Sequence, residues 1–239
     1  MAAGWDASAQ AWIAIQGETG DFGRVHVLDA PMLAQVAACA PANVLDVGCG
    51  EGRFCRMLGA QGIATTGIDP AAALIAQARA LHPDGNYRIA TAGTMQVDAA
   101  AFDMAVCYLS LIDMPDLDTA LARIVAAIRL GGHLLIANLT SFNTAAVHLG
   151  WDKSRPGEPM LPIDHYLEER PRRTAWRGVD IMNHHRPLKR YMQALLGYGL
   201  ILRHFDEPPA TGGPPDKRDR YNRVPNFHIM LWQRPLQSA

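Results

Sequence analysis

The sequence lacks the patterns that would tie it to a metal, a membrane or an oxidising compartment. Only four cysteines occur in 239 residues, and none stands at the spacing of a zinc site. No apolar run approaches the roughly 18 residues of a membrane span, and no charged-then-apolar leader opens the chain. We therefore expect reduced thiols, no metal and a cytoplasmic protein that makes no membrane contact.

An excess of charge of one sign is also missing. Lys and Arg together number 22 and Asp and Glu 23, which gives a formal net charge of −1. A chain with this balance has no bulk attraction for nucleic acid, so a nucleic-acid partner is not expected. Internal repeats and low-complexity tracts are absent too. With 49% hydrophobic residues, the chain is predicted to form one globular domain with additions.

The most informative stretch is residues 44–54, which reads V-L-D-V-G-C-G-E-G-R-F. An apolar run containing Asp46 leads directly into Gly48, Gly50 and Gly52, and a helix is expected from Arg53 onward. Glycine has no Cβ, so a ligand can lie against bare backbone at such a turn, beside the free N–H groups of the helix start. A dinucleotide-binding loop would need its third glycine one position later, where Arg53 stands.

The same stretch resembles the first motif of class I S-adenosylmethionine-dependent methyltransferases, roughly D-x-G-x-G-x-G, in their small-molecule (type 11-like) branch. The forms F-D-M-A-V-C-Y at 102–108 and R-L-G-G-H-L-L-I at 129–136 resemble the same family. The resemblance implies S-adenosyl-L-methionine as cofactor. The residues that it implies for cofactor binding are Asp46, Gly48, Cys49, Gly50, Gly52, Arg53, Asp69, Pro70, Thr91, Ala92, Gly93, Tyr108 and Leu109.

The spacing of the sequence gives a separate argument that Asp69 binds the cofactor. It follows Gly48 by 21 residues, and an acid about 20 residues after the first glycine binds ribose hydroxyls in nucleotide-binding βαβ units. Asp69-Pro70 also fits an ordinary helix N-cap, and both roles can hold together. The family usually places an acid against the adenine amino group where this chain has Thr91. The adenine contact is therefore expected from backbone or from Ala92 and Gly93.

The order of elements predicts an α/β fold with a doubly wound, seven-stranded, mostly parallel, Rossmann-like sheet. Strands are expected at 43–47, 63–68, 87–90, 102–108, 133–138, 200–205 and 227–232, and helices at 53–59, 71–81, 117–130 and 188–196. The resemblance implies that the last two strands form an antiparallel edge pair, joined by a loop over 207–215.

Two additions to this domain, 41–239, are expected. Residues 1–40 should form a helical arm, with a short helix around Trp5 to Ile13 and another over 27–40. The arm either packs as a cap or closes over the cofactor cleft, and the sequence favours neither. Residues 141–186 should form a lid inserted after the fifth strand, with an edge strand over 174–182.

Methyl transfer from a sulfonium is an in-line displacement with a neutral thioether as leaving group, so the protein mainly aligns donor and acceptor. A hydroxyl acceptor gains from a general base. Candidate bases are His148, His165 and His184, with His185 beside the last; adjacent histidines point in different directions, so one of that pair should face a pocket. Candidates for holding the acceptor are Trp12, Arg24, Trp151, Tyr166 and Tyr191.

The predicted function is methyl transfer to an oxygen or nitrogen of a small-molecule acceptor, by a monomer or homodimer. Two alternatives stay open. An RNA or protein methyltransferase would use the basic stretch 170–190 as its electrostatic footprint. A non-enzymatic S-adenosylmethionine-binding protein would keep the fold and the cofactor and catalyse nothing.

Overall fold

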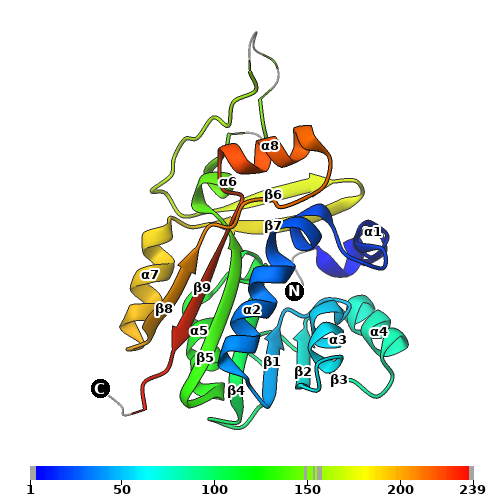
Figure 1. Ribbon diagram of the computed structural model, residues 1–239, viewed down its shortest axis with the longest axis vertical. Coiled ribbons are helices and arrows are strands. Elements are labelled where there is room, and N and C mark those ends of the chain that lie inside the picture. Colours follow the sequence, from blue (N-terminus) through cyan, green and yellow to red (C-terminus); the bar gives the residue numbers. More distant parts are fainter. Residues whose placement is uncertain (1–3, 148–149, 153, 155–157, 237–239) are drawn as a thin grey trace.

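The computed structural model describes residues 4–147, 150–152, 154 and 158–236, and Figure 1 shows its central twisted sheet. The sheet has seven strands in the order β3-β2-β1-β4-β5-β9-β8. β1 to β5 run parallel, and β9 and β8 complete the edge antiparallel. The predicted fold class and edge pair are thereby confirmed. The strands are β1 (Asn43–Val47), β2 (Ala64–Asp69), β3 (Asn86–Ile89), β4 (Phe102–Tyr108), β5 (Ile128–Leu139), β8 (Ile201–Asp206) and β9 (Phe227–Gln233).

Helices cover the sheet on both faces, as expected for parallel strands with apolar side chains on either side. α5 (Leu117–Ala127) and α7 (Leu188–Gly197) pack on one face, and α2 (Asp29–Cys39) and α3 (Arg53–Gly59) pack on the other. α4 (Ala72–Leu81) lies against β2 and β3. Because the central strands are buried on both sides, their carboxyl ends form the accessible edge at which this fold binds ligands.

The N-terminal segment divides into two parts. α1 (Trp5–Gln16) packs against α4 and the later strand β7 (Val179–His185), with Trp12 and Ile181 in their shared apolar cluster. A π-helical turn, Arg24–Leu28, then runs directly into α2, which packs on the sheet. The structure therefore groups α2 with the sheet layers, whereas the sequence placed it in the arm.

The segment after β5 forms a short helix, α6 (Ser141–Ala145), and an antiparallel hairpin of β6 (Arg170–Trp176) and β7. This hairpin crosses above the carboxyl ends of the parallel strands (Figure 1). The prediction of one strand over 174–182 was wrong, because Arg177 and Gly178 form the turn, with φ of 45° and 87°. Inside this expected lid, residues 148–149, 153 and 155–157 lie outside the described part.

Two further boundaries differ from the prediction. The helix expected over 117–130 ends at Ala127, and β5 begins at once because Ile128 pairs with Phe102 of β4. α8 (Pro215–Arg223) was missed, since it has no buried residue and hence no apolar periodicity. Among the described residues, every helix is too short or too polar to cross a bilayer.

Candidate functional site

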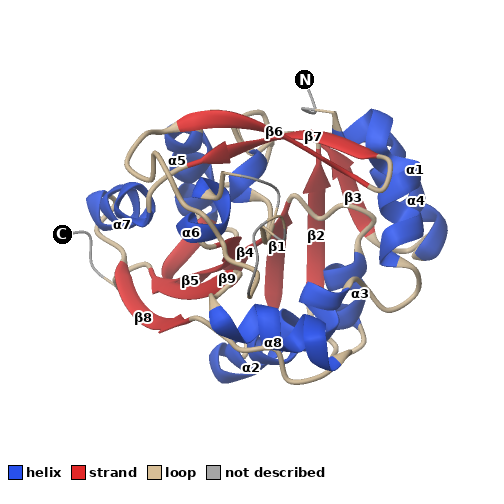
Figure 2. Cartoon of the chain, turned by 90° about the horizontal axis from the view of Figure 1, so that it is seen from above, coloured by secondary structure: helices blue, strands red, loops and turns tan. Residues whose placement is uncertain are grey.

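A cavity of about 890 Å³ opens at the carboxyl ends of β1, β2 and β4. Figure 2, seen from above, shows the β6–β7 hairpin and α8 on opposite sides of these strand ends. Every residue predicted to bind the cofactor except Gly52 lines the cavity. Those residues are Asp46, Gly48, Cys49, Gly50, Arg53, Asp69, Pro70, Thr91, Ala92, Gly93, Tyr108 and Leu109.

The three glycines of the turn serve two different purposes. All have positive φ, 82° at Gly48, 56° at Gly50 and 75° at Gly52. A Cβ at Gly48 would lie 2.4 Å from the Ser110 side chain, and one at Gly52 would lie 2.6 Å from the Tyr87 ring. At Gly50 the nearest atom would be 3.9 Å away, on Trp12. Gly50 alone therefore presents bare backbone to open space, whereas Gly52 makes room for protein packing.

Asp69 holds this turn in place. Its Oδ2 accepts from the Gly50 N–H at 3.0 Å, and its Oδ1 accepts from the Ala71 N–H at 2.8 Å. Helix α4 is capped by Ala71 itself, so the N-cap prediction for Asp69 was wrong. Burial raises the pKa of Asp69 to about 6. Each carboxylate oxygen keeps a second lone pair for a ligand hydroxyl at the cavity.

Asp46 is a buried carboxyl with an incomplete set of partners. The Cys55 thiol donates to its Oδ2 at 3.4 Å, while Oδ1 has no partner among the described residues. Burial raises the pKa of Asp46 to about 7. A buried acceptor without a donor is rare in proteins, and a hydrogen-bond donor on a ligand would satisfy it. The site thus fits a cofactor that carries hydroxyl and ammonium groups.

Asp113 belongs to the cavity wall and was not predicted. It closes a 3₁₀ turn, Leu111–Asp113, five residues after the end of β4. The Asn183 side chain on β7 donates to its Oδ1 at 2.5 Å. Burial raises the pKa of Asp113 to about 7. Its position shortly after the end of a strand could have indicated a site residue. In the sequence, however, Asp113 begins a polar loop that looks ordinary.

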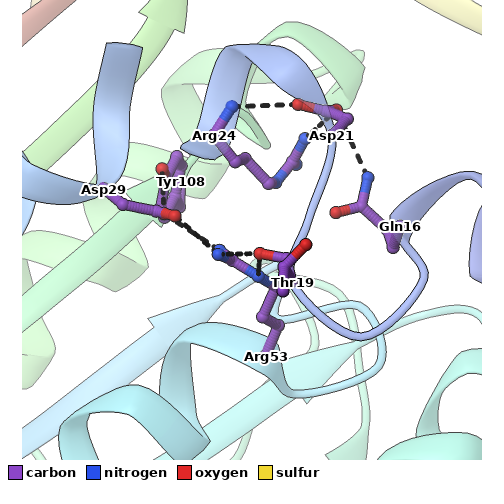
Figure 3. A network of polar contacts seen from close by, with 7 residues as sticks. All are labelled: Gln16, Thr19, Asp21, Arg24, Asp29, Arg53 and Tyr108. Carbon is purple, nitrogen blue, oxygen red and sulfur yellow. Dashed lines mark hydrogen bonds and ion pairs between the residues drawn. The ribbon is translucent and has the colours of Figure 1, made fainter. Parts of the chain in front are cut away.

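A polar network ties the loop after α1 to the floor of the cavity (Figure 3). The Arg53 guanidinium donates to the Thr19 carbonyl and pairs with Asp29 at 2.5 Å. The Tyr108 hydroxyl donates to the same Asp29 at 2.9 Å. Arg53, which directly follows the glycine turn, therefore anchors the loop after α1 to that turn, and it also lines the cavity.

Arg24 forms the second part of this network (Figure 3). It pairs with Asp21 at 2.7 Å, and Gln16 also donates to Asp21. Although burial opposes ionisation, Arg24 holds the pKa of Asp21 below its usual range. The Arg24 guanidinium lies 4.8 Å from the Trp12 ring centroid and 5.5 Å from that of Tyr108. Its charge is thus already matched within the protein.

The histidines predicted as bases do not gather at the cavity. His148 lies outside the described residues. His165 is exposed and contacts Glu168 at 2.8 Å, and His184 faces away from the cavity lining. His185 does line it, but Nε2 lies 2.9 Å from the Tyr166 carbonyl and Nδ1 2.7 Å from the Thr144 hydroxyl. With both ring nitrogens engaged and its pKa lowered by burial, His185 is a structural residue.

The residues predicted to hold the acceptor divide in the same way. Trp12, Arg24 and Trp151 line the cavity. Tyr166 instead packs its ring against Phe142, with centroids 5.6 Å apart. Tyr191 is 2% exposed and belongs to the core beneath α5 and α7. The structure places these two tyrosines outside the site.

A doubly wound sheet with a glycine turn after its first strand and an acid ending its second defines the Rossmann-like class of cofactor-binding proteins. Within the chain, residues 45–136 match the family model of the methyltransferase domain. Residues 45–136 therefore carry the features of the class I S-adenosylmethionine-dependent methyltransferases, and the chain is similar to proteins of that family.

Individual relatives agree with this family. A malonyl-(acyl-carrier protein) O-methyltransferase from Pseudescherichia vulneris is 28% identical over 62% of this chain and 59% of that protein. The O-methyltransferase resE from Aspergillus sclerotiorum is 34% identical over 44% and 43%. The crystal structure of an S-adenosylmethionine-dependent methyltransferase from Mesorhizobium loti superposes with a TM-score of 0.72, at 28% identity over 84% and 96%. The chain spans about half the length of the curated relatives that it matches.

Proposed function

We propose that this protein binds S-adenosylmethionine in the cavity and transfers its methyl group to an oxygen or nitrogen of a small-molecule acceptor. The observation that carries this proposal is the turn at Gly50, open to the cavity and fixed by the Asp69 carboxylate. Asp69 would bind the ribose hydroxyls, and the segment Thr91 to Gly93 would lie against the adenine. The backbone around Gly48 would hold the methionine part.

Bound S-adenosylmethionine supplies a methyl group already activated by a positively charged sulfur. The chain's own residues have to align the acceptor and keep water out. The aromatic side chains of the arm and the hairpin, Trp12 and Trp176, wall the cavity for this purpose. Where the acceptor atom carries a proton, the Asp113 carboxyl is the group at the cavity wall placed to receive it.

The arrangement of the basic stretch favours a small acceptor over RNA. Arg173 pairs with Asp180 at 2.5 Å, and Arg190 pairs with Asp118 at 2.7 Å. Arg186 is 4% exposed and donates to backbone carbonyls of the loop after β4. These three arginines are engaged within the fold and do not present a continuous phosphate-binding face. All four cysteines are unpaired thiols, which supports a cytoplasmic location.

Calorimetric titration with S-adenosylmethionine and S-adenosylhomocysteine tests the cofactor part. Asp69→Asn should weaken binding about tenfold or more, because a neutral amide replaces the acceptor of charge-assisted hydrogen bonds. Asp84→Asn, in an exposed turn, is the matched control and should bind normally. Equal affinity of Asp69→Asn and wild type would reject the ribose role. Cofactor binding without turnover on any acceptor would favour the non-enzymatic alternative.

A further inference from the structure

The charged side chains of the cavity are unevenly distributed. Four acids come from the strand ends and the turns that follow them: Asp46, Glu51, Asp69 and Asp113. Asp21 and Asp116 also line the cavity, as do Arg24 and Arg53, each of which is already paired with an acid. The bases at the outer part come from the β6–β7 hairpin and from α8: Arg172, Arg177, Lys217 and Arg220. The two outer elements lie above the strand ends, on opposite sides of the opening (Figures 1 and 2). An acidic floor suits the positively charged cofactor, and a basic rim suits a ligand of the opposite sign.

Three of the outer cations form no close ion pair within the described part of the chain. Among the described residues, neither Arg172, Arg177 nor Lys217 forms an ion pair with a carboxylate, whereas Arg220 pairs with Asp216 at 3.3 Å. The Arg172 guanidinium donates only to the Thr144 carbonyl, at 2.8 Å. Burial lowers the pKa of Arg172, with Arg170 contributing. Burial likewise lowers the pKa of Lys217, with Arg177 contributing and the Asp21 carboxylate acting in the opposite direction. Crowded, partly desolvated cations are costly, and an incoming anion would relieve that cost.

Aromatic rings stand among these cations. Phe22 and Tyr221 pack 4.7 Å apart between the arm and α8, and the Lys217 ammonium lies 4.3 Å from the Phe22 centroid. Trp12 and Trp176 meet edge to face at 6.5 Å beneath the hairpin. All of these side chains line the cavity. Ring faces and edges of this kind favour a flat, conjugated body over a flexible aliphatic one.

We infer that the acceptor is a flat, conjugated anion, such as an aromatic carboxylate, whose charged group faces Arg172, Arg177 and Lys217. The inference rests on the proposed function, because an acceptor presupposes the methyl donor. It adds what the family does not specify, namely the charge and the shape of the second ligand. It also assigns α8, which reaches the core only through Tyr221, a role in binding that ligand.

The test uses a pair of probes that differ in charge but hardly in shape, 2-naphthoate and 2-naphthamide. The protein is first saturated with S-adenosylhomocysteine, and each probe is then titrated by calorimetry and by quenching of tryptophan fluorescence. The carboxylate should bind at a single site about tenfold or more tightly than the amide. Its affinity should fall as salt is added, because the contact is between opposite charges.

Neighbouring arginines on β6 provide a matched pair of variants. Arg172→Gln should remove most of the preference for the carboxylate, whereas Arg173→Gln, on the outer face of the same strand, should keep it. Lys217→Gln on the solvent-exposed α8 repeats the test at a position where the fold is not at risk. Failure of both probes to bind, equal binding of the two, or equal effects of Arg172→Gln and Arg173→Gln would overturn the inference. Binding of S-adenosylhomocysteine, measured first in every variant, separates this outcome from failure of the proposed function.

Discussion

At the scale of single residues, the glycine turn shows how one motif serves both packing and binding. Gly48 and Gly52 are required because Ser110 and Tyr87 occupy the space of a side chain. Gly50 is required for its backbone conformation and for the space it leaves above it. The sequence pattern assigns all three glycines to the ligand, whereas in the structure Gly48 and Gly50 line the cavity and Gly52 does not.

The glycines should therefore separate stability from binding. Gly52→Ala forces a methyl group against the Tyr87 ring in a left-handed conformation, and we expect a loss of about 2 kcal/mol or more in the free energy of unfolding. Gly50→Ala should lower the free energy of unfolding by only about 1 kcal/mol, because it adds backbone strain but no steric clash. Gly50→Ala should nevertheless weaken S-adenosylhomocysteine binding more than Gly52→Ala does. Denaturant unfolding and calorimetry on both variants check this, and a reversed order in either measurement contradicts the assignment.

The buried carboxyls give the site a pH dependence. The pKa values of Asp46 and Asp113 are raised to about 7 and that of Asp69 to about 6, all by burial. Each group holds a proton in the folded state at a pH where the unfolded chain has released it. These groups therefore favour folding at low pH, and that contribution is lost as the pH rises through about 6 to 7.

Cofactor binding should show the opposite trend. The ionised carboxylates are the better partners for hydroxyl donors and positive charge. The affinity for S-adenosylmethionine should rise between about pH 5.5 and about pH 7.5, and Asp69→Asn should reduce that rise. Calorimetric titrations across this range measure it. An affinity that falls with pH, or a variant with the wild-type profile, would count against the assigned carboxyls.

At the scale of elements, the arm and the hairpin both contribute side chains to the cavity wall. The Ser8 hydroxyl on α1 accepts from the Asp180 N–H at 3.0 Å and lies 3.2 Å from the Asp180 carbonyl, which fastens α1 to β7. Arg53 fastens the loop after α1 to the cofactor turn. Trp12 both packs in the apolar cluster and lines the cavity. The two roles that the sequence left open for the arm are therefore compatible.

Removing the contacts of Arg53 should increase local opening of the loop after α1 and of no other part of the fold. Arg53→Gln removes the ion pair with Asp29 and the main donor to Thr19. We expect several-fold faster hydrogen exchange at amides of that loop, such as Gly20 and Arg24, with unchanged protection in β4 and β5.

The control for this experiment is Arg79→Gln, which removes a similar bond from an arginine to a carbonyl, at Tyr87, away from the arm. It should leave exchange in the loop after α1 unchanged. If Arg53→Gln exchanges there as slowly as the wild type, the network of Figure 3 does not hold the arm.

At the scale of the whole molecule, the sheet was predictable because its signals are local. The runs that form β1 and β4 are apolar on both faces and end at glycines or polar turns, so their bounds were predicted as observed. α8 carried no such signal, because it has no fully buried residue and packs on the molecule through Tyr221 against Phe22 and Phe227. The β6–β7 hairpin was misread because its turn contains Arg177 in a left-handed conformation, which no residue preference indicates.

The candidate site was predictable only where a motif specifies it. The residues predicted to bind the cofactor stand at fixed positions after strands, and all but Gly52 line the cavity. The rest of the candidate site depends on which side chains the folded chain brings together. Asp113 meets Asn183 across 70 residues. Of the histidines singled out by residue type alone, His165 is exposed and His185 is engaged by Thr144 and Tyr166. Tertiary pairing of this kind leaves no trace in local sequence.

The most direct measurement of the central claim is a crystal structure of the protein with S-adenosylhomocysteine bound. The account predicts the nucleoside beside Gly50, its ribose hydroxyls on the Asp69 carboxylate and its adenine next to Ala92 and Gly93. A nucleoside bound elsewhere, or a glycine turn that remains unoccupied at a saturating concentration of S-adenosylhomocysteine, would contradict this prediction.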